Sequence, residues 1–377
     1  MTLRTELVRN HGELSDACKA RWNELASNPF QRWEWLGSWM EAFETQYSMA
    51  ALKVLDGDRI RGFAPLCIDQ RLTSGRTLMF MGAGKACTDH LSILTEDGHA
   101  TEVCEAIADW LIDEAPNNCA WDHLELIGVD LHDLAVDLLV TALEKRGIRT
   151  DVSDGLGCYA INLPSTWDDY VKMRSKSGRR EIRQSARNID DGLIQVKTIE
   201  SADELNRYWG DFVDLHQRRR TDSGTDNCFE HPHFESFLRT AATRLLDAGL
   251  LRFIVALAED QPVGVQFSVA DHSAWHFYQS GMDPEASSLR PGLSVFCHTI
   301  RESIEAGLSQ FDMMRGDEPY KLRWRATLRP TQEVRAFSPR LASQVRGGVV
   351  KAGSALKQFL SLGQAWVPGG SVSNSNC

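Results

Sequence analysis

The chain has 377 residues, 42% hydrophobic and 25% charged, which indicates a globular protein with more than one core. Its formal net charge of −11 argues against general nucleic-acid binding. No apolar run reaches the roughly eighteen residues of a membrane helix, so we expect no membrane insertion. Nine cysteines without a CxxC pair argue against a zinc site, and the N-terminus lacks an export signal, so we expect a cytoplasmic protein without a metal.

The first half alternates helices and strands in an order that predicts a mixed α/β layer arrangement. A β-hairpin is expected around Asp56-Gly57-Asp58, because two apolar runs flank this turn sequence. The tryptophans at 33, 35 and 39 are expected to pack a helix onto the core, and residues 82–85 to form a turn, since they lack phosphate-loop spacing. The remaining expected elements are helices at 12–26, 33–45, 100–114 and 131–146, and strands at 77–81 and 123–127.

The second half repeats this order, which predicts an internal duplication. An apolar hairpin at 250–269 matches the first hairpin, and the run at 308–316 matches the one at 121–129, because both close on glycine after a helix. We therefore expect an α/β (α+β) fold with two tandem domains, each a mixed, mostly antiparallel sheet flanked by helices. The predicted boundaries are 1–157, 158–340, and a C-terminal helix and flexible tail at 341–377.

A basic helix is expected between the two halves. Residues 172–187 carry seven Lys or Arg against one Glu, a net charge of +6 in an acidic protein. Arg179, Arg183 and Arg187 are four residues apart and share one helix face. This face is either solvated or meets an anionic partner, for which cofactor phosphates, an anionic glycan, a nucleotide sugar and tRNA are the candidates.

The stretch from Ala274 to Ala326 carries most of the functional information. It predicts a strand at 275–281, a loop ending in Arg290-Pro291-Gly292, a helix at 293–306, a strand at 310–315 and a short basic helix. A strand that leads into a helix N-terminus can bind phosphate through backbone N–H groups and the helix dipole. Proline presets the first helical turn and glycine permits close approach, so this turn is a candidate cofactor cradle.

The motifs of this stretch resemble those of the CelD-like acetyltransferases, double-domain members of the GNAT superfamily related in fold to the FemABX aminoacyl-transferases. The motifs are Tyr278-x-x-Gly281-x-Asp283-Pro284, Arg290-Pro291-Gly292-Leu293 and Gly316-x-Glu318-x-Tyr320-Lys321-x-x-Trp324. The resemblance implies two GNAT-like halves and an acetyl-CoA or longer acyl-CoA donor. The first half lacks equivalents of the last two motifs, so we expect a degenerate N-terminal domain and a catalytic C-terminal one.

The resemblance also implies roles for individual residues. The cofactor pyrophosphate is expected at Arg290, Pro291, Gly292, Leu293 and Ser294. Tyr320 is the expected acid for the leaving thiolate, Glu318 or Asp317 the base, and Lys321 a phosphate-neutralising or carboxylate-orienting group. The substrate side is expected to involve His216, Tyr278, Arg180, Arg183 and Trp324. Alternatively, Tyr320, Lys321 and Trp324 only pack the last helix, and His216 is a structural histidine.

Three functions remain open from the sequence. The first is N-acyl transfer from acyl-CoA to an amine or hydroxyl of a sugar or polysaccharide precursor. The second is a FemABX-like transfer that uses aminoacyl-tRNA and acts on a cell-wall precursor. The third is a non-catalytic GNAT scaffold that binds a glycan or a partner in polysaccharide biosynthesis. The sequence does not fix the acceptor, the acyl length or the oligomeric state.

Overall fold

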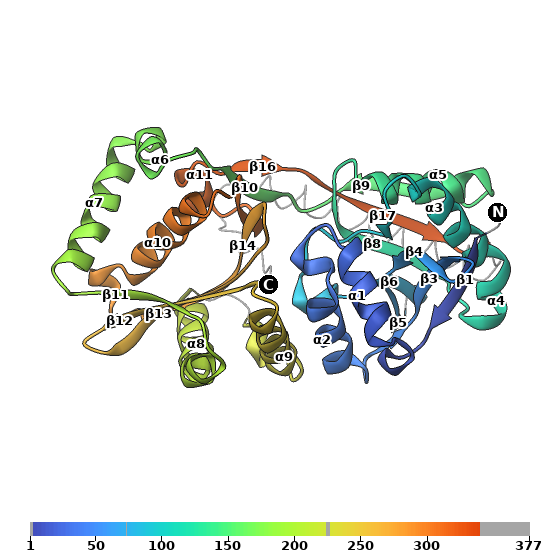
Figure 1. The fold of residues 1–377 in the computed structure, drawn as a ribbon, viewed down its shortest axis with the longest axis horizontal. Helices are drawn as coiled ribbons and strands as arrows, with labels where there is room; N and C mark the ends of the chain where they lie inside the picture. The colour runs from blue at the N-terminus through green and yellow to red at the C-terminus, as the bar shows by residue number, and fades with distance from the viewer. Residues whose placement is uncertain (1–2, 73, 224–226, 340–377) are drawn as a thin grey trace, which may run out of the picture. The chain divides into compact units, whose positions relative to one another are not determined.

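The computed structural model describes residues 3–72, 74–223 and 227–339. They divide into two compact units (Figure 1). One unit is formed by the chain up to Gly155 together with the segment from Thr331, and the other by Leu156–Pro330. Within these described ranges no helix has the length and apolarity to cross a membrane. The C-terminal helix and tail predicted at 341–377 lie outside the described residues.

The first unit combines two sheets with the helices that flank them. Their strand orders are β1-β3-β4-β7 and β2-β5-β6-β8-β17-β9. The strands are β1 (Arg4–Val8), β2 (Tyr47–Met49), β3 (Ala51–Asp56), β4 (Arg59–Ala64), β5 (Leu66–Arg71), β6 (Gly75–Phe80), β7 (Leu94–Thr95), β8 (His123–Asp130), β9 (Thr150–Asp154) and β17 (Thr331–Phe337). The helices are α1 (Asp16–Leu25), α2 (Trp33–Phe43), α3 (Ala100–Asp109), α4 (Ala115–Asn118) and α5 (Leu134–Lys145).

The second unit has one sheet, ordered β11-β12-β13-β14-β15-β10-β16. The strands are β10 (Cys158–Asn162), β11 (Gln195–Ile199), β12 (Leu251–Ala258), β13 (Gln261–Ala270), β14 (Ala274–Met282), β15 (Gln310–Arg315) and β16 (Thr327–Arg329). The helices are α6 (Trp167–Met173), α7 (Lys176–Asp190), α8 (Ala202–Ser223), α9 (Phe234–Asp247), α10 (Pro291–Glu305) and α11 (Pro319–Arg323). Helices α7 and α10 lie on one side of this sheet and α8 and α9 on the other (Figure 1).

Both units contain antiparallel hairpins and one parallel strand pair. In the first unit β6 and β8 are parallel, and in the second β14 and β15 are parallel. The predicted hairpins are present as β3–β4 and β12–β13, the second turning through Glu259 and Asp260 with φ of 50° and 61°. The predicted fold class, mixed sheets flanked by helices, is therefore confirmed.

The path of the chain near residue 330 differs from the predicted domain boundary. The sequence placed everything up to residue 340 in the second domain, whereas β17 lies between β8 and β9 in a sheet of the first unit. The segment pairs there because Val334 and Ala336 are buried, while the intervening Arg335 makes an ion pair with Glu125 of β8. The pairing of β17 with β8 joins residues about 200 positions apart, and a local sequence pattern does not report such a contact. The sequence therefore assigned the segment to the domain that precedes it in the chain.

Apolar side chains of α10 form the centre of the second unit's core. Phe296 packs against the rings of Phe277, Phe311 and Trp324 at centroid distances of 5.5, 5.2 and 4.5 Å. A buried side chain of this size contributes about 1.5–3 kcal/mol to folding. In the first unit the tryptophans of α2 are buried as predicted, with Trp35 donating its indole N–H to Thr88 Oγ1 at 3.0 Å.

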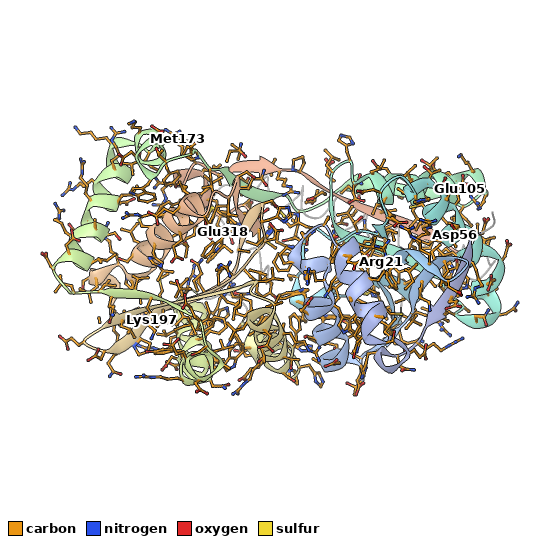
Figure 2. All side chains as sticks on the ribbon, viewed as in Figure 1. Arg21, Asp56, Glu105, Met173, Lys197 and Glu318 are labelled. Atoms are coloured by element: carbon orange, nitrogen blue, oxygen red, sulfur yellow. The ribbon has the colours of Figure 1, made fainter. Side chains whose placement is uncertain are left out.

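The predicted basic helix at 172–187 is two helices. Helix α6 ends at Met173, and α7 begins after Ser175, whose Oγ caps the new helix by accepting from the Gly178 N–H at 3.1 Å. A serine at the N-cap starts a helix more readily than it continues one. The interruption turns Arg174 into a buried residue, whereas the neighbouring Met173 stays exposed (Figure 2).

Candidate active site

A cavity of about 810 Å³ lies within the second unit, beyond the point where two parallel strands stop pairing. Ala274–His276 of β14 pair with Gln310–Asp312 of β15, but β14 continues to Met282 without that partner. The edge of β14 from Phe277 onward therefore has backbone groups open to a ligand. Phe277 and the stretch 280–283 line the cavity, together with parts of α10 and α11.

The N-terminus of α10 forms one wall, as the sequence predicted. Arg290, Pro291, Gly292 and Leu293 all line the cavity. Arg290 adopts the left-handed conformation, with φ of 54°. Its carbonyl accepts the N–H groups of Leu293 and Ser294 at 3.0 and 3.3 Å. Pro291 has no N–H, so Gly292 supplies the remaining first-turn donor, and the positive charge of this wall comes mainly from the Arg290 side chain.

Glycines allow this turn to sit close to the sheet. A Cβ on Gly264 of β13 would lie 3.2 Å from the Pro291 Cβ, and one on Gly292 would lie 2.5 Å from the Met282 Cε. Close approach of backbone to a ligand or a second backbone is a position where glycine is favoured. Ser294, predicted to touch the cofactor, is instead fully buried and accepts a hydrogen bond from Ser185 of α7 at 3.1 Å. It fixes α10 against α7.

Tyr320 and Trp324 of the last motif line the cavity from α11. Burial raises the pKa of the Tyr320 phenol to about 12, and the negative charge of Glu318 acts in the same direction. The phenol is therefore protonated at neutral pH and can donate a proton. Glu318 and Asp317 are exposed and do not line the cavity.

Lys321 is a structural residue in this geometry. Its ammonium is buried and donates to the carbonyls of Met314, Arg315 and Gly316 at 3.0, 2.7 and 3.1 Å. It also pairs with Glu318 at 3.0 Å. These contacts hold the loop that follows β15, and they use the donors that the sequence assigned to a phosphate or a carboxylate.

Four predicted substrate contacts lie outside the cavity lining. His216 is fully buried between α8 and β14, with Nε2 3.1 Å from Gln279 Oε1, and burial lowers its pKa to about 4. Tyr278 packs against Phe267 at a ring distance of 6.0 Å. Arg180 and Arg183 are exposed on α7. The predicted basic face therefore exists, but these two arginines do not form a wall of this cavity.

Three arginines that line the cavity, Arg174, Arg219 and Arg323, were not among the site residues predicted from the sequence. Arg174 lies at the interruption between α6 and α7, and Arg219 lies on α8, three residues after His216. Arg219 donates to the Ser280 hydroxyl and reaches the Ser280 carbonyl at 3.4 Å. Burial lowers the pKa of Arg219, although the guanidinium remains charged at neutral pH. The serine cap at Ser175 was the available signal that Arg174 would leave the helix surface.

Residues 176–322 match the sequence model of the Acetyltransferase (GNAT) domain. This range runs from the start of α7 to α11 and includes most of the cavity lining. A search of curated protein sequences returns no match to this chain.

Solved structures share the fold at low sequence identity. The crystal structure of FemX matches with a TM-score of 0.63 and 10% identity, over 87% of this chain and 98% of that one. A conserved protein of unknown function from Bacteroides thetaiotaomicron matches with a TM-score of 0.54 and 12% identity, over 89% and 100%. A tandem GNAT protein from the clavulanic acid biosynthesis pathway matches with a TM-score of 0.47 and 11% identity, over 90% and 99%.

The domain match and the cavity together define an enzyme class. The protein contains a GNAT acetyltransferase domain and is an acyltransferase. GNAT domains use acyl-CoA, which agrees with the donor expected from the sequence.

Proposed function

We propose that the protein is a CelD-like N-acyltransferase that transfers an acyl group from acetyl-CoA or a longer acyl-CoA to an amine or hydroxyl of a sugar or polysaccharide precursor. The carrying observation is the cavity at the divergence of β14 and β15, which joins the Arg290-Pro291-Gly292 turn to Tyr320. The second unit, 156–330, is the proposed catalytic part.

The residues present fit an acyl-CoA donor. Arg290 and the Gly292 N–H would bind the pyrophosphate, and the open edge of β14 would pair with the pantetheine amides. CoA supplies the activated thioester. Gly264 pairs with Met282 of β14 and has no Cβ, so Pro291 can pack directly against β13 at this point.

Acyl transfer then needs a nucleophile and two proton transfers. The acceptor amine attacks the thioester carbonyl, the C–N bond forms, and the C–S bond breaks to release a thiolate. Tyr320 donates its phenolic proton to that sulfur. Glu181 lines the cavity and offers a carboxylate to accept the amine proton, whereas the predicted bases Asp317 and Glu318 would act only through water.

Calorimetric titration and a thiol-release assay with acyl-CoA of several chain lengths test this proposal. Arg290→Gln is expected to weaken acetyl-CoA binding about 10-fold, the effect of losing one charge-assisted hydrogen bond. It should not change the binding of acetyl-pantetheine, which lacks the pyrophosphate. Arg301→Gln is the matched control, because Arg301 lies on the same helix but pairs with Glu305 at 2.8 Å. Absence of acyl-CoA binding and turnover at every chain length would sink the proposal.

A FemABX-like reaction with charged tRNA is the second candidate. The fold shared with FemX and the exposed arginines of α7 favour it. Such binding should weaken steeply with salt, because lysines and arginines displace counterions from phosphates. This candidate is excluded if the protein retains no charged tRNA on a filter, or if the retention is the same at low and high salt. Arg180→Gln with Arg183→Gln should abolish any retention that is found.

A further inference from the structure

Arg174 is a buried cation at the wall of the cavity. Its side chain has a relative exposure of 2%, and its guanidinium carbon lies 4.1 Å from the Trp324 ring centroid. One terminal nitrogen donates to the Tyr170 hydroxyl at 3.4 Å, and that hydroxyl donates to the Trp324 carbonyl at 3.1 Å. The two aromatic residues therefore fix the plane of the guanidinium.

The surroundings of Arg174 do not neutralise its charge. Within the described residues no carboxylate lies within 4.0 Å of it, and its buried Nε has no hydrogen-bond partner. Taking a cation out of water without a counter-ion is unfavourable, and contact with a tryptophan face offsets only part of that cost. The balance is unfavourable unless a ligand supplies the missing negative charge.

Arg219 adds a second, half-buried guanidinium to the same cavity. It also lacks an ion pair among the described residues, and its contacts are the hydroxyl and the carbonyl of Ser280. Neither group carries a full charge. By contrast, the exposed Arg290 at the other wall lies 4.0 Å from Glu181. Arg323 also lines the cavity, but it is exposed to solvent, so Arg174 and Arg219 are the less solvated of the lining cations that lack an ion pair among the described residues.

We propose that the acceptor of this acyltransferase is an anion, a carboxylate- or phosphate-bearing amine or alcohol whose charged group is bound by Arg174, with Arg219 as the second cation. The inference rests on the proposed acyl transfer and narrows its acceptor class. A planar guanidinium held against Trp324 presents paired N–H donors, the geometry that suits carboxylate and phosphate oxygens.

The first test is titration of inorganic phosphate into the full-length protein, with and without saturating acetyl-CoA. Wild type should bind phosphate saturably, and acetyl-CoA should not displace it. Arg174→Gln should weaken phosphate at least 10-fold, the effect of losing a charge-assisted hydrogen bond. Lys172→Gln is the matched control, because Lys172 is an exposed cation two residues away that pairs with Asp169 at 2.8 Å, and it should bind phosphate like wild type.

The second test compares acceptors in the thiol-release assay. Glucosamine 6-phosphate should exceed glucosamine in kcat/KM by at least 10-fold, or an amino acid should exceed its decarboxylated amine by the same factor. Arg174→Gln should remove the preference, and Arg174→Lys should restore part of it. If Arg174→Gln does not fold, Arg219→Gln carries the same comparison and should reduce the preference for the anionic acceptor.

Several results would overturn the inference. It fails if Arg174→Gln binds phosphate like wild type, or if neutral and anionic acceptors react equally well. It also fails if acetyl-CoA displaces phosphate and Arg174→Gln weakens the binding of both, because Arg174 would then bind a phosphate of the acyl donor and not the acceptor. A wild-type protein that binds phosphate but no acyl-CoA would refute the acyl transfer while leaving the anion site standing.

Discussion

Replacing Tyr320 by phenylalanine should remove the acid that protonates the leaving thiolate. Burial raises the pKa of Tyr320 to about 12, so the phenol carries its proton at neutral pH. A protonated phenol that lines the cavity can act as the general acid for a leaving thiolate.

The expected loss follows from that role. A positioned general acid accelerates a reaction by about 10²- to 10⁴-fold, so kcat of Tyr320→Phe should fall by this factor. This fall corresponds to an increase of roughly 3–5 kcal/mol in the activation free energy. The acetyl-CoA dissociation constant should stay within about threefold, because the lost hydroxyl acts on the transition state. Thiol release under saturating donor measures kcat, and calorimetry measures binding. Tyr159→Phe is the control, since Tyr159 belongs to β10 and does not line the cavity.

The pH profile provides an independent check. Because the raised pKa keeps the Tyr320 phenol protonated below about pH 11, wild-type activity should show no alkaline decline from this group between pH 7 and 10. A fall in kcat of less than threefold would refute the general-acid role. So would an alkaline limb below pH 10 that Tyr320→Phe abolishes, because the phenol would then ionise far more easily than its burial implies.

Three further predictions concern stability and are read by urea unfolding. Gly281→Ala should destabilise the protein by several kcal/mol, because the added Cβ would lie 2.6 Å from the Leu215 carbonyl carbon. Gly210 on α8 has open space around it, so Gly210→Ala should stabilise the protein by up to about 1 kcal/mol. Equal effects of the two substitutions on stability would contradict the close packing at Gly281. Lys321→Met should cost about 2–4 kcal/mol through three orphaned carbonyls, and a near-neutral result would contradict the loop role. Burial lowers the pKa of His216 from 6.5 to about 4, so the unfolded state binds more protons than the folded state between these pH values. The free energy of unfolding should therefore fall by up to about 3 kcal/mol as the pH is lowered from 6.5 to 4. His216→Gln should flatten this dependence of stability on pH, and an unchanged dependence would refute the lowered pKa of His216.

The sequence was informative wherever local pattern decides structure. The strand at 310–315 and the hairpin turns were predicted with correct position, because alternation and turn residues act over a few neighbours. The Arg290-Pro291-Gly292 turn and Tyr320, which the motif order of the resemblance named as site residues, line one cavity in the structure, while their roles stay predictions.

The remaining features depend on contacts that sequence spacing does not encode. Arg180 and Arg174 looked alike in a basic run, yet a single serine cap exposes one and buries the other. Lys321 looked like a phosphate ligand because its motif is basic, but the fold of the loop after β15 surrounds its ammonium with carbonyls. The role of such a residue depends on the loop around it, and this loop takes its conformation only when the sheet has formed.

The position of β17 has a consequence for synthesis of the protein on the ribosome. Among the described strands β9 pairs with β17 alone, and β17 follows the whole second unit in the chain. The 176 residues from Leu156 to Thr331 (331 − 155) take roughly 10–35 s to translate. During this interval β8 and β9 present unpaired edges, which are prone to pair with other chains. A chain truncated after residue 155 lacks the strand that joins β8 to β9, so it should aggregate rather than fold.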